Sequence, residues 1–332
     1  MNYHFASFKG GFILNKVVLL TTGGTIASVP NEQSGKLSSG ALTGEELAEM
    51  LKLPTDIDVV IDSVFQKPSM HVGFEDLIWL KEKIEAYFED DMVSGVVVTH
   101  GTDSLEESAY FLDLTINDQR PVVITGSQRS PGEMGSDAYI NMRHAIYSAC
   151  SQDLHGAGAV VVFNERIFPA KYVKKEHASN IQGFNAFGFG YLGIIDNDEV
   201  HIYQKPIHRE TYDLITDIPR VDIVKTYSGA DGAFIKAARE SQAKGIILEG
   251  VGRGQVAPGM MAEIVKSIEA GLRIVITTTS EEGSVYTTYD YLGSAYDLYK
   301  HGVILGDDDD SKKARIKLAV ILASNFEGDI TY

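Results

Sequence analysis

Cysteine is almost absent from this sequence. Cys150 is the only one in 332 residues, so no disulfide can form within the chain. It ends a run of apolar and small residues, HAIYSAC, and we expect it to be a buried core residue rather than a catalytic thiol. Stability must therefore come from a packed core, for which a hydrophobic content of 44% is ordinary.

Long apolar runs and an excess of positive charge are also missing. No run approaches the roughly 20 apolar residues that span a bilayer. Lys16 interrupts the N-terminal apolar stretch, which has no small-residue cleavage site, so we expect no signal peptide and a cytoplasmic location. The formal net charge of −17 disfavours binding to nucleic acid or to an anionic membrane.

Histidine and cysteine do not cluster. His100 lies in a polar segment of interest, but the nine histidines form no His-Glu-x-x-His pattern and no Cys/His group has the spacing of a zinc site. We expect no metal site and metal-independent chemistry.

The first half of the sequence alternates between strand-like and helical segments. Apolar runs of strand length lie at 16–21, 56–62, 95–99, 121–125 and 159–163. Segments of helical period lie near 43–53, 73–88, 104–115 and 136–150. This alternation predicts right-handed crossovers and a mostly parallel sheet that is covered by helices on both faces.

The pattern changes after about residue 165 and resumes later. Short strand-like pieces lead into a polar connection, and strands then follow at 221–227, 245–250 and 273–279, with helices near 232–242, 259–270 and 311–323. The four aspartates from Asp307 to Asp310 predict a solvated loop before the last helix. We predict an α/β fold with a larger N-terminal catalytic domain (1–207), a linker (208–220) and a smaller C-terminal α/β domain (221–332).

Two polar segments follow predicted parallel strands. In TTGGTIAS (21–28) the glycine pair permits a tight turn, and Thr25 emerges just past the strand as a candidate nucleophile or as a simple turn threonine. In THGTDSLEES (99–108), Thr102 and Asp103 follow the third predicted strand. Ser104 and Glu107 there have capping-box spacing, so this segment also predicts a helix start.

A threonine hydroxyl is a poor nucleophile unless another group takes its proton. A carboxylate at the same sheet edge could hold a substrate ammonium, so the two segments suggest acyl transfer. The irregular segment after the fifth strand offers three lysines as the base, between which spacing does not choose: Lys171, Lys174 and Lys175.

TTGGTIAS and VVVTHGTDS, in this order and about 75 residues apart, closely resemble the two signature motifs of the bacterial-type L-asparaginases, a family that includes glutaminase-asparaginases. The resemblance covers nearly the whole chain. It extends to PSMH (68–71), PVVITGSQRSP (121–131), FNERIFPAKYVKKEHAS (163–179), GVGRGQVAPG (250–259) and ARIKLAVILA (314–323).

The resemblance implies hydrolysis of L-asparagine to L-aspartate and ammonia, without a cofactor. It implies that Thr25 is the nucleophile that forms an acyl-enzyme. It also implies that Thr102, Asp103 and Lys175 form the companion group that activates water or nucleophile and holds substrate. Lys175 is chosen among the three lysines because the segment YVKKEHAS aligns it with the lysine of the family's companion group.

The same resemblance implies how substrate is bound. Ser69 matches the serine that binds the α-carboxylate, and Asp103 matches the carboxylate that binds the α-ammonium. Ser127 matches the residue whose backbone meets the amide, and Met70 and Gly101 occupy neighbouring substrate-binding positions.

The resemblance further implies a homodimer, or a homotetramer built from dimers, in which a partner subunit completes each site. GVGRGQ (250–255), which ends in Gln255, matches the donated loop. A dinucleotide fingerprint is disfavoured there, because Gln255 stands where the third glycine would be.

Three positions depart from the family pattern. Leu37 lies closest to the missing loop tyrosine, and Met70 replaces a polar residue. The acidic residue that a partner often supplies has no clear counterpart in 284–293, which instead offers Tyr286, Tyr289, Asp290 and Tyr291. We favour Tyr289 as the replacement hydrogen-bonding partner of Thr25; the alternative is that these tyrosines only pack an interface.

Two other functions fit this sequence. One is a glutaminase-asparaginase of broader amide specificity, and the other is a catalytically weak amino-acid-binding sensor. A glutaminase subunit of an amidotransferase is disfavoured, because the chain has no spare length for the added RNA-side domain. Ammonia release from asparagine separates enzyme from sensor, and a comparison with glutamine separates the two enzymes.

Overall fold

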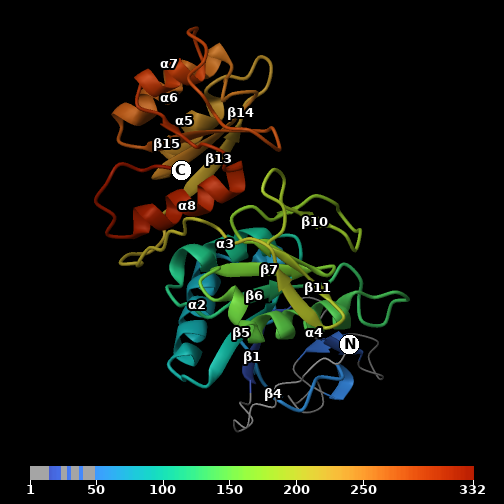
Figure 1. Cartoon of the computed structure of the whole chain (residues 1–332). Coiled ribbons are helices and arrows are strands. Elements are labelled where there is room, and N and C mark those ends of the chain that lie inside the picture. Colours follow the sequence, from blue (N-terminus) through green and yellow to red (C-terminus); the bar gives the residue numbers. More distant parts are fainter. Residues whose placement is uncertain (1–14, 24–27, 31–36, 40–48) are drawn as a thin grey trace.

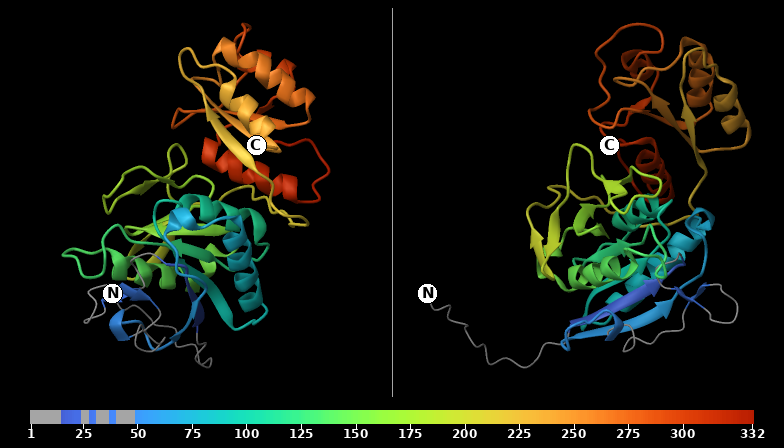
Figure 2. Two further views of the ribbon diagram at one scale, coloured as in Figure 1. Left: turned by 180° about the vertical axis from the view of Figure 1, so that it is seen from behind. Right: turned by 90° about the vertical axis from the view of Figure 1, so that its right-hand side faces the viewer.

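The computed structural model describes residues 15–23, 28–30, 37–39 and 49–332, which form two α/β domains (Figure 1). The larger domain contains an eight-stranded sheet and the smaller one a four-stranded sheet. The two lie one above the other in the side view, with helix α8 (Ser311–Ala323) at their junction (Figure 2). No helix in the described ranges is both long enough and apolar enough to cross a membrane.

The larger sheet has the strand order β12-β11-β8-β7-β6-β5-β1-β4. Its five parallel strands are β1 (Asn15–Thr21), β4 (Ile57–Ser63), β5 (Val93–Thr99), β6 (Val122–Thr125) and β7 (Ala159–Phe163). The antiparallel remainder is β8 (Arg166–Pro169), β11 (Gly193–Asp196) and β12 (Glu199–Ile202). The prediction of a mostly parallel first sheet is confirmed.

Alternating side chains of β1 explain why this sheet is covered on both faces. Val18 and Leu20 pack against α2 (Phe74–Phe88) and α3 (Leu105–Thr115). Val17 and Leu19 point the other way, into a second core that α4 (Ala138–Cys150) covers. Successive strand side chains face opposite sides, so a strand buried on both faces reads as a continuous apolar run.

The smaller sheet is parallel and has the order β13-β14-β15-β16. Its strands are β13 (Val221–Lys225), β14 (Gly245–Gly250), β15 (Arg273–Thr278) and β16 (Ile304–Leu305). One face packs against α5 (Ala233–Glu240), α6 (Met261–Glu269) and α7 (Ala295–Lys300). The other face packs against α8.

Short elements complete the described chain. They are the pairs β2 (Ser28–Pro30) with β3 (Leu37–Ser39) and β9 (Lys174–Lys175) with β10 (Phe184–Asn185), and the 3-10 turns η1 (Ser69–His71), η2 (Gln152–Leu154) and η3 (Pro258–Met260). The helix predicted near 43–53 falls mostly outside the described residues, of which 49–50 are helical. The bounds given for the linker remain a prediction.

Two predictions about single residues need correction. Cys150 is only partly buried beside the core that α4 covers, and burial raises the pKa of its thiol to about 12, which keeps the thiol protonated at neutral pH. The segment Asp307 to Asp310 is not a uniformly solvated loop. Asp310 caps α8, and Asp309 is 3% exposed.

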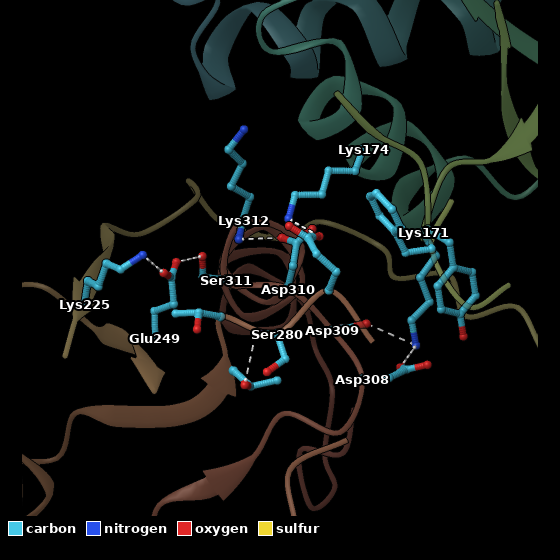
Figure 3. Close-up of a pocket in the computed structure, with 15 residues that line it drawn as sticks. Lys171, Lys174, Lys225, Glu249, Ser280, Asp308, Asp309, Asp310, Ser311 and Lys312 are labelled. Carbon is cyan, nitrogen blue, oxygen red and sulfur yellow. Dashed lines mark hydrogen bonds and ion pairs between the residues drawn. The ribbon is translucent and has the colours of Figure 1, made fainter. Parts of the chain in front are cut away.

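Asp309 lies where the two domains meet. A pocket at this junction is lined by charged side chains from both domains, several of which form ion pairs (Figure 3). The Asp309 carboxylate lies 3.1 Å from Lys171 Nζ, but it accepts no well-formed hydrogen bond from the described residues. Burial raises its pKa to about 6, against the opposite influence of Lys171.

This raised pKa makes stability depend on pH. Between about pH 4 and 6 the folded protein keeps a proton on Asp309 that the unfolded chain has already released. The free energy of unfolding therefore falls as pH rises through this window, and this contribution is constant above it.

Asp309→Asn removes that titration. The stability of the variant relative to the wild type should rise by about 3 kcal/mol between pH 4 and 7. Urea denaturation of both proteins across this range measures the difference. Asp308→Asn, which removes the more exposed carboxylate beside the same lysine, should show a smaller rise, because Asp309 still titrates in that variant. A difference for Asp309→Asn that does not change with pH would contradict this assignment.

Candidate active site

The candidate site begins at neighbouring strand ends. Strands β1, β5 and β6 are adjacent and parallel, and their last residues, Thr21, Thr99 and Thr125, are in register. The segments that leave these strands therefore emerge at one edge of the sheet, where open α/β sheets bind ligands.

The proposed nucleophile Thr25 lies outside the described residues, but the turn that precedes it is described. Thr22 Oγ1 donates to the Thr99 carbonyl at 2.9 Å. Gly23 has φ +113°, and a Cβ at this position would lie 2.4 Å from the Lys67 carbonyl oxygen. Only glycine fits such a backbone without strain, so the turn requires Gly23.

The structure brings together Thr102, Asp103 and Lys175. Lys175 Nζ donates to Thr102 Oγ1 at 2.8 Å and to Asp103 Oδ1 at 2.6 Å. The lysine side chain is 12% exposed and that of Asp103 is 65% exposed. A hydroxyl in contact with an amine can pass a proton, and a carboxylate open to solvent can receive a cationic group.

The other two candidate lysines point elsewhere. Lys171 pairs with Asp308 and Asp309, and Lys174 donates to Glu281 at 2.7 Å. The side-chain contacts therefore single out Lys175 as the lysine beside Thr102 and Asp103, which sequence spacing could not do.

The loop at Ser69 lies against the loop that carries Thr102. Ser69 is buried, and a Cβ on Gly101 would lie 2.9 Å from its Cβ and Oγ. Ser104 is the N-cap of α3, but its hydroxyl donates to the Ser69 carbonyl at 2.7 Å and makes no capping bond. The predicted helix start is confirmed, but the Ser104 side chain forms no capping box and instead joins the two loops. Met70 beside them is 69% exposed.

The segment after β6 contributes polar atoms. Ser127 Oγ and Gln128 Nε2 are buried and have no hydrogen-bond partner among the described residues. Gln128 Oε1 lies 3.5 Å from Thr102 Oγ1, which places an amide beside the lysine–threonine contact. Gln128 was not predicted from the sequence, since a glutamine in QRS gives no signal of burial.

Glu106 is a second residue that sequence reasoning missed. It is 1% exposed, and its carboxylate accepts from the Lys175 backbone N–H. An acid in the first turn of a helix normally indicates only a favourable interaction with the helix dipole. The sequence therefore does not reveal this contact.

His100 is a structural residue in this arrangement. Its ring nitrogens lie 2.8 Å from the Gly101 carbonyl and 3.0 Å from Ser108 Oγ, and burial lowers its pKa. Within the ranges described above, no three His, Cys, Asp or Glu side chains gather in a way that could hold a metal ion. Metal independence remains a prediction.

The predicted partner-loop residues lie in the smaller domain. Gln255 Oε1 accepts from Ala295 N at 3.2 Å. Tyr289 is 50% exposed, with its ring 6.0 Å from that of Tyr291, and Asp290 pairs with Lys300. Tyr289 and Asp290 are exposed on the single chain, as residues that contribute to another subunit would be, whereas Gln255 is only partly exposed.

Comparisons with known proteins agree with this architecture. Residues 16–208 match the family model described as "Asparaginase, N-terminal", and residues 220–329 match "Glutaminase/Asparaginase C-terminal domain". An L-asparaginase of Bacillus licheniformis is 63% identical over 313 residues, which cover 94% of this chain and 97% of that protein. L-asparaginase 2 of Bacillus subtilis is 31% identical over 84% of this chain and 76% of its own length.

A solved structure is also similar. The structure described as a probable cytoplasmic L-asparaginase from Campylobacter jejuni has a TM-score of 0.82 and 30% identity, and the match covers 93% of this chain and 95% of that one. These matches include both domains and both threonine motifs, and they confirm the resemblance found in the sequence. The chain belongs to the bacterial-type L-asparaginase family.

Proposed function

We propose that this protein hydrolyses L-asparagine to L-aspartate and ammonia through an acyl-enzyme on Thr25. The observation that carries the proposal is the contact of Lys175 Nζ with both Thr102 Oγ1 and Asp103 Oδ1 at the strand ends. Membership of the asparaginase family supports the same reaction.

The proposed chemistry has two steps. In the first, Thr25 Oγ attacks the side-chain amide carbon, its proton passes to the departing nitrogen, and ammonia leaves an ester on the threonine. In the second, water attacks that ester, the bond between the acyl carbon and the Thr25 oxygen breaks, aspartate is released, and a proton from the water returns to the Thr25 oxygen. Thr102 and Lys175 are suited to take the proton from this water, because their polar atoms lie 2.8 Å apart.

Residues around Thr102 and Lys175 would bind and orient the substrate. The exposed Asp103 carboxylate would receive the α-ammonium, and Ser69 the α-carboxylate. The backbone at Ser127 would meet the amide. Gly101 and Met70 would line the same surface, where Gly101 allows the two loops to approach closely.

We further propose a cytoplasmic homodimer, or a dimer of dimers, in which Gln255 and Tyr289 reach a partner's site. The exposed position of Tyr289 on a loop of the smaller domain supports this arrangement, and Gln255 lies on a neighbouring loop where it is partly exposed. The activity is proposed to need neither a cofactor nor a metal. Glutamine is a second candidate substrate, since the matching C-terminal family model includes glutaminases.

Thr25→Val tests the nucleophile. The folded variant should still bind aspartate but lose several orders of magnitude in kcat, because nucleophile removal leaves only binding and oxyanion contacts. Thr102→Val should be comparably damaging if the two threonines act in sequence. Ammonia release from asparagine, measured beside glutamine, gives the result. Substantial turnover by Thr25→Val would refute the mechanism, and aspartate binding by a wild-type protein without turnover would indicate a sensor.

Tyr289→Phe tests the replacement for the missing loop tyrosine. The substitution keeps the ring and removes only the hydroxyl, so assembly should survive while kcat falls roughly 10²- to 10⁴-fold, the scale of a lost proton-transfer group. Tyr286→Phe and Asp290→Asn are the matched variants. If one of these variants loses activity and Tyr289→Phe does not, the role is assigned to that position. If all three variants are unimpaired, the proposed replacement of the phenol is refuted.

A further inference from the structure

Glu106 is a buried carboxylate, and each of its two oxygens accepts a hydrogen bond. Oε2 accepts from the Lys175 backbone N–H at 2.5 Å, and Oε1 accepts from Lys312 Nζ at 2.6 Å. The side chain is 1% exposed, so the carboxylate has exchanged water for these two donors. Removal of either donor would leave a buried charge without full compensation.

The first of these contacts joins the two halves of the proposed catalytic group. Thr102 and Asp103 precede α3, and Glu106 is the second residue of that helix. Lys175 lies on β9, which is two residues long and forms a two-stranded sheet with the equally short β10. So short a ladder fixes its backbone weakly, and Glu106 supplies an additional anchor from the segment that carries Thr102.

The second contact comes from the smaller domain. Lys312 and Lys313 are in the first turn of α8, whose N-cap Asp310 accepts from both of their backbone N–H groups. The Lys312 side chain extends from this turn toward the helices of the larger domain (Figure 3). Burial disfavours the charge of Lys312, but Glu106, together with the nearby Glu107 and Asp310, outweighs that effect and raises the pKa of the lysine.

Lys313 binds backbone carbonyls of the two segments that the Glu106–Lys175 contact joins. Its buried Nζ donates to the Glu106 carbonyl at 2.7 Å and to the Ala170 carbonyl at 2.6 Å. Ala170 precedes β9, while Glu106 is in the first turn of α3. One ammonium of the smaller domain therefore ties together the two segments that carry Lys175 and Thr102.

We propose that Glu106 is a positioning residue for Lys175, held in place by Lys312 and Lys313, so that packing of the smaller domain through α8 sets the geometry of the catalytic group in the same chain. This inference rests on the proposed function, in which Lys175 transfers a proton. It predicts that loss of the Lys312–Glu106 contact impairs chemistry more than substrate binding.

Lys312→Met, Lys312→Arg and Glu106→Gln are compared with Arg315→Met in the full-length protein. Arg315 is the matched control, because it joins the same two helices through Glu107 at 3.5 Å without contacting Glu106. Lys312→Met should lower kcat for asparagine roughly tenfold with KM within about twofold, since a small displacement of a reacting group affects the chemical step. Lys312→Arg should recover most of the rate.

Glu106→Gln should lower kcat at least as much as Lys312→Met. The double variant should be no worse than the poorer single variant, because both changes act on one contact. Arg315→Met should keep wild-type kcat even where its melting temperature falls as far as that of Lys312→Met.

Three outcomes would overturn the inference. The first is a wild-type kcat in both Lys312→Met and Glu106→Gln, and the second is a lowered kcat in Glu106→Gln but not in Lys312→Met. The third is an equal loss of kcat in Lys312→Met and Arg315→Met, which would indicate a general effect of contact between the domains. Failure of the proposed function is distinct, because the wild-type protein would then release no ammonia from asparagine.

Discussion

Helix α8 contributes to the cores of both domains, and the candidate site depends on that burial. Ile316 and Val320 pack into the larger domain, whereas Ala314, Leu318 and Ala319 pack beneath the smaller sheet. A helix that is covered on both sides must be largely apolar, as ARIKLAVILA is apart from Arg315 and Lys317. Its first turn carries two further lysines, Lys312 and Lys313, which reach the segment that carries Thr102 and Asp103.

This arrangement explains how an irregular segment can position the lysine that we propose as a proton-transfer group. The sheet positions the ends of β1, β5 and β6, but Lys175 lies on a strand of two residues outside that sheet. Its position depends on side-chain contacts with Glu106, Thr102 and Asp103. Hydrogen bonds to charged groups are among the stronger ones in proteins, and they are suited to this task where backbone pairing is sparse.

The regular parts of the fold were predictable from the sequence for a clear physical reason. Parallel strands buried on both faces leave continuous apolar runs, and β4, β5 and β7 appear within a few residues of the predicted bounds. The α7 helix and the short pairs, such as β9 with β10, were not predicted, because so few residues carry no periodic signal. Asp309 was misassigned because its burial arises from packing between domains.

The site was only partly predictable. Spacing identified Thr102 and Asp103, but three lysines within five residues could not be ranked until their side chains were seen to reach different partners. Ser104 fits a capping pattern in sequence, yet its hydroxyl reaches the Ser69 carbonyl, which is distant along the chain.

The most direct test of the account is the activity of Lys175→Ala on asparagine with and without added methylamine. The account predicts a loss of several orders of magnitude in kcat, partly restored by the amine in proportion to its unprotonated form, and no restoration of Thr25→Val under the same conditions. Near wild-type turnover by Lys175→Ala would contradict the claim that this lysine, in contact with Thr102 and Asp103, moves the proton.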